Sequence, residues 1–370
     1  MTARSTPEKK RRYDRLQALE LLADLPMGPL MNLAHQERVR RFPEGRVTFV
    51  VDTNPNYTNV CVTGCAFCAF CRKNHDTDAY LLSPQEVAEK VESAAAKGAT
   101  TVLLQGGHNP KVRLKDWQAY IAAIRSVCPH VHIHPFSPAE IVFMAGQEKC
   151  SVTDVLLALW EAGIRTIPGG GAEILTEAVR KIIAPRKATT GQWLDVCEKA
   201  HRIGFKTTAT MMFGHVETDD DIIDHLLRLR DLQDLTSGFT SFIPWSFKPG
   251  RTPLSKQVRH PAHPARYVRI IAVARLVLDN FPHIQSSWFS ETIPAGQLGL
   301  LSGAYDFGGV LVEEHVHKEA GHDRQATVDT VLTIIRRAGF IPARRDSFYR
   351  VQETMAPPMP VGTASLIADR

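Results

Sequence analysis

The chain has 370 residues, of which 44 are Lys or Arg and 39 are Asp or Glu, giving a formal net charge of +5. This length suffices for one large domain or two ordinary ones whose core needs no disulfides, and the odd count of seven cysteines argues against a fully paired disulfide framework. No apolar stretch is nearly long enough to span a membrane, and no apolar region of a secretion signal follows the N-terminal charges. Membrane and secreted proteins are therefore excluded, and we expect a cytoplasmic protein without a membrane partner.

The first forty residues carry a basic tail and then a leucine pattern. No basic stripe with interleaved aromatics follows the tail, so we expect a solvated, partly frayed N-terminus and no nucleic-acid partner. The leucines recur at close to helical spacing before Pro26, which predicts an N-terminal helical cap over residues 1–44. The basic residues are Arg4, Lys9, Lys10, Arg11 and Arg12, and the leucines are Leu16, Leu19, Leu22 and Leu25.

Short β-branched or apolar runs alternate with longer helical segments from residue 45 onward. Strands are predicted at 47–51, 101–105, 131–134, 165–168, 206–212, 238–243, 283–287 and around Asp306. Between them, Ser83 and Glu86 form a capping box at the start of one helix, and further helices are predicted at 114–127, up to about 162, up to about 203, and at about 219–235 and 265–281. The pattern gives about eight βα units over 45–345 without a domain break, followed by a tail at 346–370.

Such alternation predicts an α/β protein with a parallel sheet, either a barrel or an open doubly wound sheet. Residues suited to chemistry follow nearly every predicted strand. Loops that converge on one face of a barrel produce this distribution, whereas an open sheet concentrates such residues at one switch point. We therefore expect a TIM-type (βα)8 barrel with the N-terminal helical cap.

Three cysteines follow the first predicted strand as C-x-x-x-C-x-x-C, at Cys61, Cys65 and Cys68. Thiolates spaced in this way suit a 4Fe-4S cluster, and three ligands leave one iron open to a substrate or cofactor. Cys71 could act as a fourth ligand and close the cluster, and a structural zinc site is the other alternative, although no second ligand pair completes it. The remaining cysteines, Cys128, Cys150 and Cys197, are expected in the core.

The cysteine run, with an aromatic residue, Phe67, before the last cysteine, resembles the motif of the radical S-adenosylmethionine (SAM) superfamily. The resemblance implies a 4Fe-4S cluster held by the three cysteines, with SAM bound to its open iron and cleaved to a 5′-deoxyadenosyl radical. It also implies that the segment after the second strand, Gln105, Gly106 and Gly107, seats SAM together with Phe67. Read alone, Gly-Gly after a strand is more often a turn.

Several further segments are similar to the cyclic dehypoxanthine futalosine synthase family of the futalosine route to menaquinone. The similarity covers residues from about 15 to 345 and includes LLQGGHNP, HIHPFSPAEI, IPGGGAEIL, FGHVET, FTSFIPWSF and GAYDFGG. It implies cyclisation of dehypoxanthine futalosine, a small-molecule substrate, with an electron donor such as flavodoxin or ferredoxin. Aminofutalosine synthase shares the GGGAE and GH-x-E-T segments, but QGG-x-NP and Trp245 fit the cyclase better. The deazaflavin-precursor synthase shares CAF, QGG and the H-x-H-x-FSP segment but lacks the triple glycine at 169–171.

The implied reaction ends in a deprotonation, for which His134, Glu173 and Glu217 are unranked candidates. His132 and His134 project to one face of a strand, toward the substrate or as a hydrogen-bonded core pair. Glu173 follows the three glycines and is also a candidate contact to SAM, while Glu217 suits a helix N-terminus. Weaker candidates are Asp306 and Glu314, the arginines Arg186 and Arg251 for a substrate carboxylate, and Trp245, Phe247 and Trp288 as cavity walls.

The chain departs from that family at Cys71, His108 and Tyr305, which places the substrate contacts near residues 108 and 305 in question. A rival from another class is a closed-cluster redox sensor without turnover, with Cys71 as its fourth ligand. Such a sensor would neither bind SAM nor change its reduced spectrum in the presence of SAM.

Overall fold

The computed structural model of the protein describes residues 12–312, 316–321 and 326–355. Its strands are β1 (Arg46–Thr53), β2 (Thr101–Leu104), β3 (His132–Pro135), β4 (Thr166–Ile167), β5 (Lys206–Phe213), β6 (Phe239–Ser246), β7 (His283–Ile284), β8 (Asp306–Leu311), β9 (Ile341–Arg345) and β10 (Val351–Thr354). Its helices are α1 (Arg15–Ala23), α2 (Met27–Arg41), α3 (Pro84–Ala96), α4 (Leu114–Val127), α5 (Pro138–Glu148), α6 (Val152–Glu161), α7 (Glu177–Ile183), α8 (Thr190–Ile203), α9 (Asp219–Thr236), α10 (Pro264–Val277), α11 (Ile293–Leu301), α12 (Val316–Glu319) and α13 (Val328–Arg337), with a 3-10 turn η1 (Pro253–Lys256).

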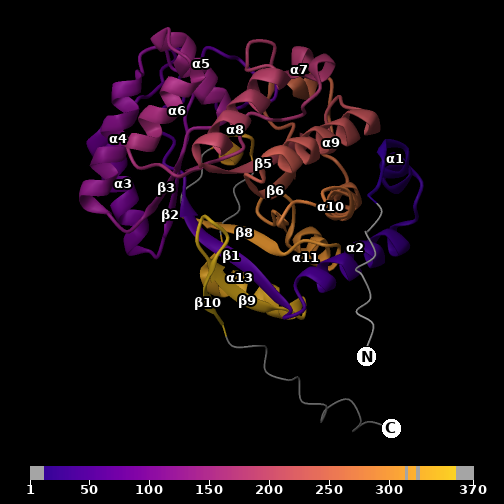
Figure 1. Cartoon of the computed structure of the whole chain (residues 1–370). Coiled ribbons are helices and arrows are strands. Elements are labelled where there is room, and N and C mark those ends of the chain that lie inside the picture. Colours follow the sequence, from indigo (N-terminus) through magenta and orange to yellow (C-terminus); the bar gives the residue numbers. More distant parts are fainter. Residues whose placement is uncertain (1–11, 313–315, 322–325, 356–370) are drawn as a thin grey trace, which may run out of the picture.

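The strands β1 to β8 form a curled, parallel arrangement in chain order. One sheet pairs β8, β1, β2 and β3, and a second pairs β4, β5, β6 and β7. A single bridge between Gln285 and Asp306 links the end of β7 to β8. Between β3 and β4, the two sheets are joined by side-chain hydrogen bonds of His132 and His134 with Thr166 instead of a backbone ladder. Figure 1 shows the helices ranged around these strands, so the predicted (βα)8 barrel is confirmed.

Local sequence explains where many helices begin. A serine or threonine N-cap and an acidic or amide residue three positions later satisfy the first free N–H groups, as predicted for Ser83 and Glu86. The same capping box starts α5, α6, α8 and α9. These helices therefore start at fixed residues, which sets the length of the loops between strand and helix.

The N-terminal segment folds as two helices that pack on the outside of the barrel, and Figure 1 places α1 beside α9 and α2 near α10 and α11. Leu21 and Leu22 of α1 are buried, whereas Leu16, which the spacing had placed on the packed face, is 76% exposed. Within the described residues, no helix is long and apolar enough to cross a membrane.

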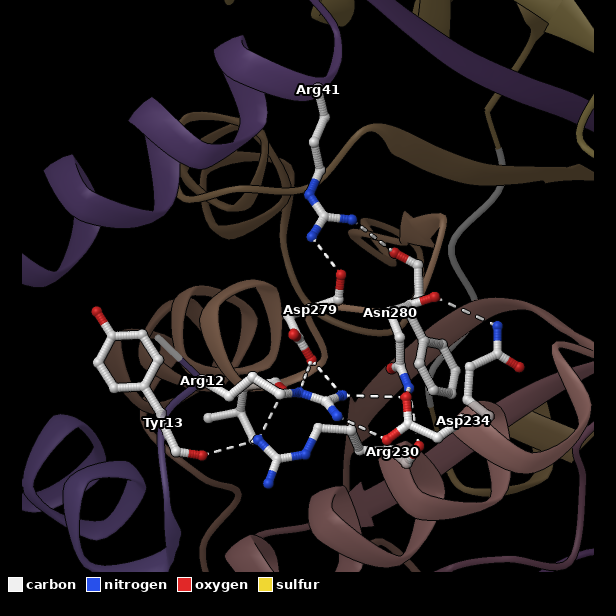
Figure 2. A network of polar contacts seen from close by, with 10 residues as sticks. Arg12, Tyr13, Arg41, Arg230, Asp234, Asp279 and Asn280 are labelled. Atoms are coloured by element: carbon white, nitrogen blue, oxygen red, sulfur yellow. Dashed lines mark hydrogen bonds and ion pairs between the residues drawn. The ribbon is translucent and has the colours of Figure 1, made fainter. Parts of the chain in front are cut away.

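Arg12 is not solvated and frayed as expected. Its guanidinium lies 2.7 Å from the Asp234 carboxylate of α9 and 2.6 Å from the Asp279 carboxylate after α10 (Figure 2). Arg41 of α2 donates to the main-chain oxygen of Asp279, and Arg230 donates to that of Tyr13. The end of the basic tail is thus attached to the barrel, while Arg4, Lys9, Lys10 and Arg11 lie outside the described residues.

Two strands follow the eighth unit. Strand β9 pairs in parallel with the first half of β1, over Arg46–Phe49. Further along β1, Asp52 and Thr53 pair with β2. Strand β10, within the segment expected as a tail, pairs with β9 in an antiparallel ladder. The turn between these strands carries Ser347 and Tyr349 beneath the barrel interior, where both are buried.

Candidate functional site

A cavity of about 410 Å³ occupies the barrel interior and extends to the cysteine loop. Its upper wall comes from the loop after β1 and the glycine turns after β2 and β4. Its floor comes from side chains of β1, β2, β8 and the segment that follows β9. The lining residues of the upper wall include Cys61, Cys65, Phe67, Cys68, Cys71, Gln105, Gly106, Gly107, Gly169, Gly170, Gly171, Glu173 and Lys187, and those of the floor include Asp52, Thr101, Gln285, Gly309, Arg345, Ser347 and Tyr349.

The three predicted cluster cysteines lie together on the upper wall. All are free thiols, and the loop is folded by backbone hydrogen bonds from Cys68 N to Cys65 O and from Cys61 N to Arg72 O. A hydrogen bond from Cys71 lowers the pKa of the Cys61 thiol, which favours the thiolate, the form that binds metals. Burial raises the pKa of Cys65 to about 12.

Three thiols on one wall of the cavity are a donor set that fits an iron–sulfur cluster. Cys71 lies beside Cys61, with its Sγ donating to the Cys61 carbonyl oxygen at 3.3 Å. Within the described part of the chain, no three His, Cys, Asp or Glu side chains are arranged around a position for a single metal ion. The loop therefore presents Cys71 as a neighbour of the triplet, bonded to the backbone of one of its members.

The glycines after β2 allow two loops to approach closely. A Cβ on Gly107 would lie 2.2 Å from the Val60 carbonyl oxygen, and one on Gly106 would lie 2.7 Å from the Tyr57 ring. The Gly106 N–H donates to Glu140 Oε1 at 3.1 Å. The pair thus has a packing role against the cysteine loop and also borders the cavity. Glu140, which also caps α5 through Ser137, links this turn to that helix.

A second glycine turn and an ion pair complete the upper wall. A Cβ on Gly170 would lie 2.8 Å from Gln105 Nε2, so the turns after β2 and β4 touch across the cavity edge. Glu173 adopts a φ of 42° and lies 2.6 Å from Lys187 Nζ. Burial raises the pKa of Glu173, but the opposing effect of Lys187 and Arg180 is larger and lowers it overall. Lys187 also lies 5.5 Å from the centre of the Phe67 ring.

The two histidines of β3 form a hydrogen-bonded group. Thr166 Oγ1 lies 2.6 Å from His132 Nε2 and 2.7 Å from His134 Nδ1. Burial lowers the pKa of His132 to about 4 and that of His134 to about 3, so both rings are neutral. Of the two, His134 lines the cavity.

Other sequence candidates lie away from the lining residues. Glu217 accepts hydrogen bonds from the Gly214 and His215 N–H groups. Arg186 donates to the Thr63 carbonyl oxygen and packs over Gly64. Arg251 is exposed on the loop before η1, and Glu314 lies outside the described residues.

Of the three predicted aromatic walls, Trp245 borders the cavity. Phe247 packs near His215, and Trp288 stacks on Phe307. Two residues at which the chain departs from the family, His108 and Tyr305, lie in different places. His108 lines the cavity beside Thr63, with Nδ1 2.9 Å from Thr63 Oγ1, whereas Tyr305 stacks on Phe42 outside it.

Two charged floor residues, Asp52 and Arg345, were not selected by the sequence analysis, whereas Asp306, one of its weaker candidates, is fully buried and is not a lining residue. Arg345 donates two hydrogen bonds, of 2.5 and 3.1 Å, to Asp306, which also accepts one from Thr48. Asp52 faces the same space from β1, and burial raises its pKa to about 7. The available signal for Asp52 was its position at the end of a β-branched run. Arg345 carried no such signal because β9 was not predicted.

Comparisons with known proteins agree with this architecture. The Radical SAM superfamily model matches residues 55–229, and the model described as CofH/MqnC C-terminal region matches residues 236–357. A methylornithine synthase (PylB) structure covers 90% of the chain and 95% of its own, with a TM-score of 0.71 at 18% identity. The hydrogenase maturase HydG of Carboxydothermus hydrogenoformans covers 92% and 78%, with a TM-score of 0.71 at 16% identity.

Two groups of curated relatives reach similar identities. A 5-amino-6-(D-ribitylamino)uracil–L-tyrosine 4-hydroxyphenyl transferase of Methanopyrus kandleri is 39% identical over 86% of the chain and 88% of the relative. A cyclic dehypoxanthine futalosine synthase of Halalkalibacterium halodurans is 38% identical over 87% and 86%. The chain therefore belongs to the radical SAM superfamily, as an enzyme of the CofH/MqnC family that uses a 4Fe-4S cluster and SAM.

Proposed function

We propose that the protein is a cyclic dehypoxanthine futalosine synthase. The observation that carries the proposal is the triple glycine turn after β4, which borders the cavity. There is no room for side chains in this turn: a Cβ on Gly169 would lie 2.4 Å from the Thr208 carbonyl oxygen, and a Cβ on Gly170 would lie 2.8 Å from Gln105 Nε2. By the resemblance, the triple glycine distinguishes the cyclase from the deazaflavin-precursor synthase, and Trp245 fits the cyclase better than aminofutalosine synthase. Both features are part of the cavity wall.

The proposed reaction is intramolecular. When bound, the cluster and SAM supply the radical that removes a hydrogen atom from the ribose of the substrate. The resulting ribose carbon radical adds to the benzoate ring, and loss of one electron and one proton restores aromaticity and leaves the spiro product. A cavity inside the barrel suits this sequence because its walls limit the access of water and other hydrogen donors to the substrate radical.

The residues on the upper wall support a division of roles. Cys61, Cys65 and Cys68 would hold the cluster. Phe67, Gln105, Gly106, Gly107 and Glu173 would seat SAM, since they surround the space beside the thiols. Lys187 would keep Glu173 ionised and in place, because the two side chains form a buried ion pair.

The test is anaerobic incubation of the reconstituted protein with dithionite, SAM and dehypoxanthine futalosine, followed by mass detection. We expect 5′-deoxyadenosine together with a product two hydrogen atoms lighter than the substrate. Deoxyadenosine without that product would keep the superfamily chemistry and reject the substrate. The same incubation with flavodoxin or ferredoxin in place of dithionite tests the proposed electron donor. A cytoplasmic location is also part of this proposal.

The second candidate is the activity named in the Methanopyrus kandleri relative, which is as similar to the chain as the cyclase relatives are. A parallel incubation with 5-amino-6-(D-ribitylamino)uracil and tyrosine distinguishes the two. Product in that arm alone would assign the transferase activity and exclude the cyclase.

A further inference from the structure

Asp52 is a buried carboxyl group at the cavity floor. It is 7% exposed and lines the cavity from β1. Its Oδ1 is buried against Gly309 and has no hydrogen-bond partner among the described residues. A buried carboxylate with an unpaired oxygen carries a desolvation cost, which a proton taken up by the carboxyl group lowers.

Strand β8 is built to leave room for this carboxyl group. A Cβ on Gly309 would lie 2.3 Å from Asp52 Oδ1, so any other residue there would displace the carboxylate. The preceding Gly308, with a φ of +84°, likewise leaves space for Gln285. The double glycine therefore forms a slot in which Asp52 and Gln285 face the cavity.

The charged neighbours of Asp52 do not neutralise it directly. Arg345 of β9 directs two hydrogen bonds to Asp306 of β8, and Tyr349 stacks over the Arg345 guanidinium at 3.8 Å. Burial raises the pKa of Asp52, Arg345 opposes this and Asp306 adds to it, leaving the pKa at about 7. The carboxylate is therefore a much stronger base than an ordinary aspartate.

The three bases considered from the sequence are less suited. His134 binds Thr166 through Nδ1 and has its pKa lowered to about 3. Glu173 is held by Lys187, and its pKa is lowered. Glu217 accepts two backbone hydrogen bonds and is not among the described residues that line the cavity.

We propose that Asp52 is the catalytic base that accepts the aromatic proton in the last step, an inference that rests on the proposed cyclase function. After the ribose carbon radical adds to the ring, the ring C–H bond at the attacked carbon breaks. Its proton passes to the Asp52 carboxylate, one electron passes to a one-electron acceptor of the iron–sulfur class, and the remaining electron of that bond restores the aromatic sextet. The protonated carboxyl group then releases its proton to solvent after product leaves.

The main test compares D52N with the wild-type holoenzyme, measuring deoxyadenosine and cyclised product in the same incubation. Asparagine keeps the shape of the side chain but is no base at neutral pH. We expect deoxyadenosine to form within about threefold of the wild-type rate, and cyclised product to fall at least about 100-fold, the lower range for loss of a general base. In D52A, added formate should restore part of the product, whereas chloride at equal ionic strength should not.

Glu291→Gln is the matched control, because Glu291 is another buried carboxylate, hydrogen-bonded to Ser246 and absent from the residues that line the cavity. Its ratio of product to deoxyadenosine should equal that of the wild type. Equal ratios in D52N and the wild type, or a parallel loss of deoxyadenosine and product in D52N, would overturn the assignment of Asp52. Failure of the wild type to cyclise the substrate would instead reject the proposed function.

A measurement without turnover gives a separate test of the same group. The infrared difference between the isolated wild-type protein and D52N should contain a protonated-carboxyl band that disappears as pH rises through about 7. The other charged groups that face this site, Arg345, Asp306 and Tyr349, are unchanged in both proteins. A carboxyl band absent above pH 5, about one unit above an ordinary aspartate, would show that Asp52 lacks the raised basicity that sets it apart from the other candidates and would overturn the proposal.

Discussion

Cys71 differs from the three predicted ligands in what its thiol does. It donates to the Cys61 carbonyl oxygen and also lowers the pKa of the Cys61 thiol. In this arrangement the Cys71 thiol favours the thiolate form of one predicted ligand, the form that binds metals. Whether the cluster is open or closed therefore depends on whether Cys71 is a fourth ligand.

Substitutions at Cys65 and Cys71 answer it. We expect Cys65→Ser to lose the iron and sulfide of the cluster, because a three-ligand site has no spare thiolate. Cys71→Ser should retain the full iron content and the SAM-dependent change in the spectrum of the reduced cluster. Metal analysis and electron paramagnetic resonance check both. Loss of iron in Cys71→Ser as complete as in Cys65→Ser would favour the closed cluster and the sensor reading.

Glycine positions give a second test at this scale. Gly107→Ala places a Cβ 2.2 Å from the Val60 carbonyl oxygen, immediately before the cluster cysteines. We expect a loss of about 1–3 kcal/mol in the free energy of unfolding, typical of overpacking, together with poorer cluster reconstitution.

Gly146→Ala is the matched control for that substitution. Gly146 lies within α5, where nothing is within 4 Å of the added Cβ, so the protein should gain about 0.5–1 kcal/mol from the lower flexibility of the unfolded chain. Chemical denaturation of both variants measures the effects. Equal stability of the two variants would contradict the packing role of Gly107.

At the scale of elements, the start of α5 is tied to the cofactor end of the cavity. Glu140 caps the helix through Ser137 and also accepts the Gly106 N–H. Burial raises the pKa of Glu140. A residue that local sequence specifies as a helix cap thus positions a turn thirty-four residues earlier in the chain.

Two capping variants separate these roles. Glu140→Gln and Asp154→Asn each replace a capping carboxylate, of α5 and α6 respectively, by an amide, and each should cost about 0.3–1 kcal/mol of stability through the lost charge at the helix N-terminus. Only Glu140→Gln should weaken SAM binding, by several-fold, because Asp154 contacts no residue of the glycine turns. Calorimetric titration of SAM into both reconstituted proteins measures this. An unchanged SAM affinity in Glu140→Gln would remove Glu140 from the cofactor site.

Sequence predicted the elements that local rules determine. The strands, the capped helices and the cysteine loop follow from periodicity, capping residues and spacing. It did not predict β9, because IPARR contains a proline and two arginines and becomes a strand only by pairing with β1. Arg345 and Tyr349 follow from that pairing. Asp52 was visible as a strand-end aspartate, but its unpaired oxygen depends on glycines more than 250 residues away.

At the scale of the whole molecule, β9 fastens the C-terminal segment to the barrel through a buried ion pair. Arg345 of β9 binds Asp306 of β8, and Thr48 of β1 donates to the same carboxylate. Side chains from β1, near the N-terminal end of the fold, and from β8 and β9, near its C-terminal end, therefore contact each other at the Asp306 carboxylate. A pair of this kind contributes little net energy when intact, but removal of one partner leaves a buried charge unbalanced.

The adjacent arginines of β9 provide a test of this closure. Arg345→Ala should reduce the free energy of unfolding by about 3–5 kcal/mol, because Asp306 stays buried without a counter-charge. Arg344→Ala removes an exposed pair with Glu353 and should cost less than about 1 kcal/mol. Denaturant unfolding of the two variants compares them directly. Similar losses would mean that β9 contributes through its backbone pairing alone.

The N-terminal segment is fastened at the opposite side of the barrel by exposed charges. Arg12 bridges Asp234 and Asp279, and its side chain is 40% exposed. Because solvent screens such pairs, Arg12→Gln should cost only about 0.5–1 kcal/mol, and the difference from wild type should shrink in high salt. The hydrogen bond from Arg12 lowers the pKa of Asp234. The stabilisation is therefore complete above the ordinary aspartate pKa and is lost as pH falls through the lowered value. Thermal unfolding at two salt concentrations and across acidic pH measures both effects, and a loss that is independent of salt would show that Arg12 acts by packing rather than by charge.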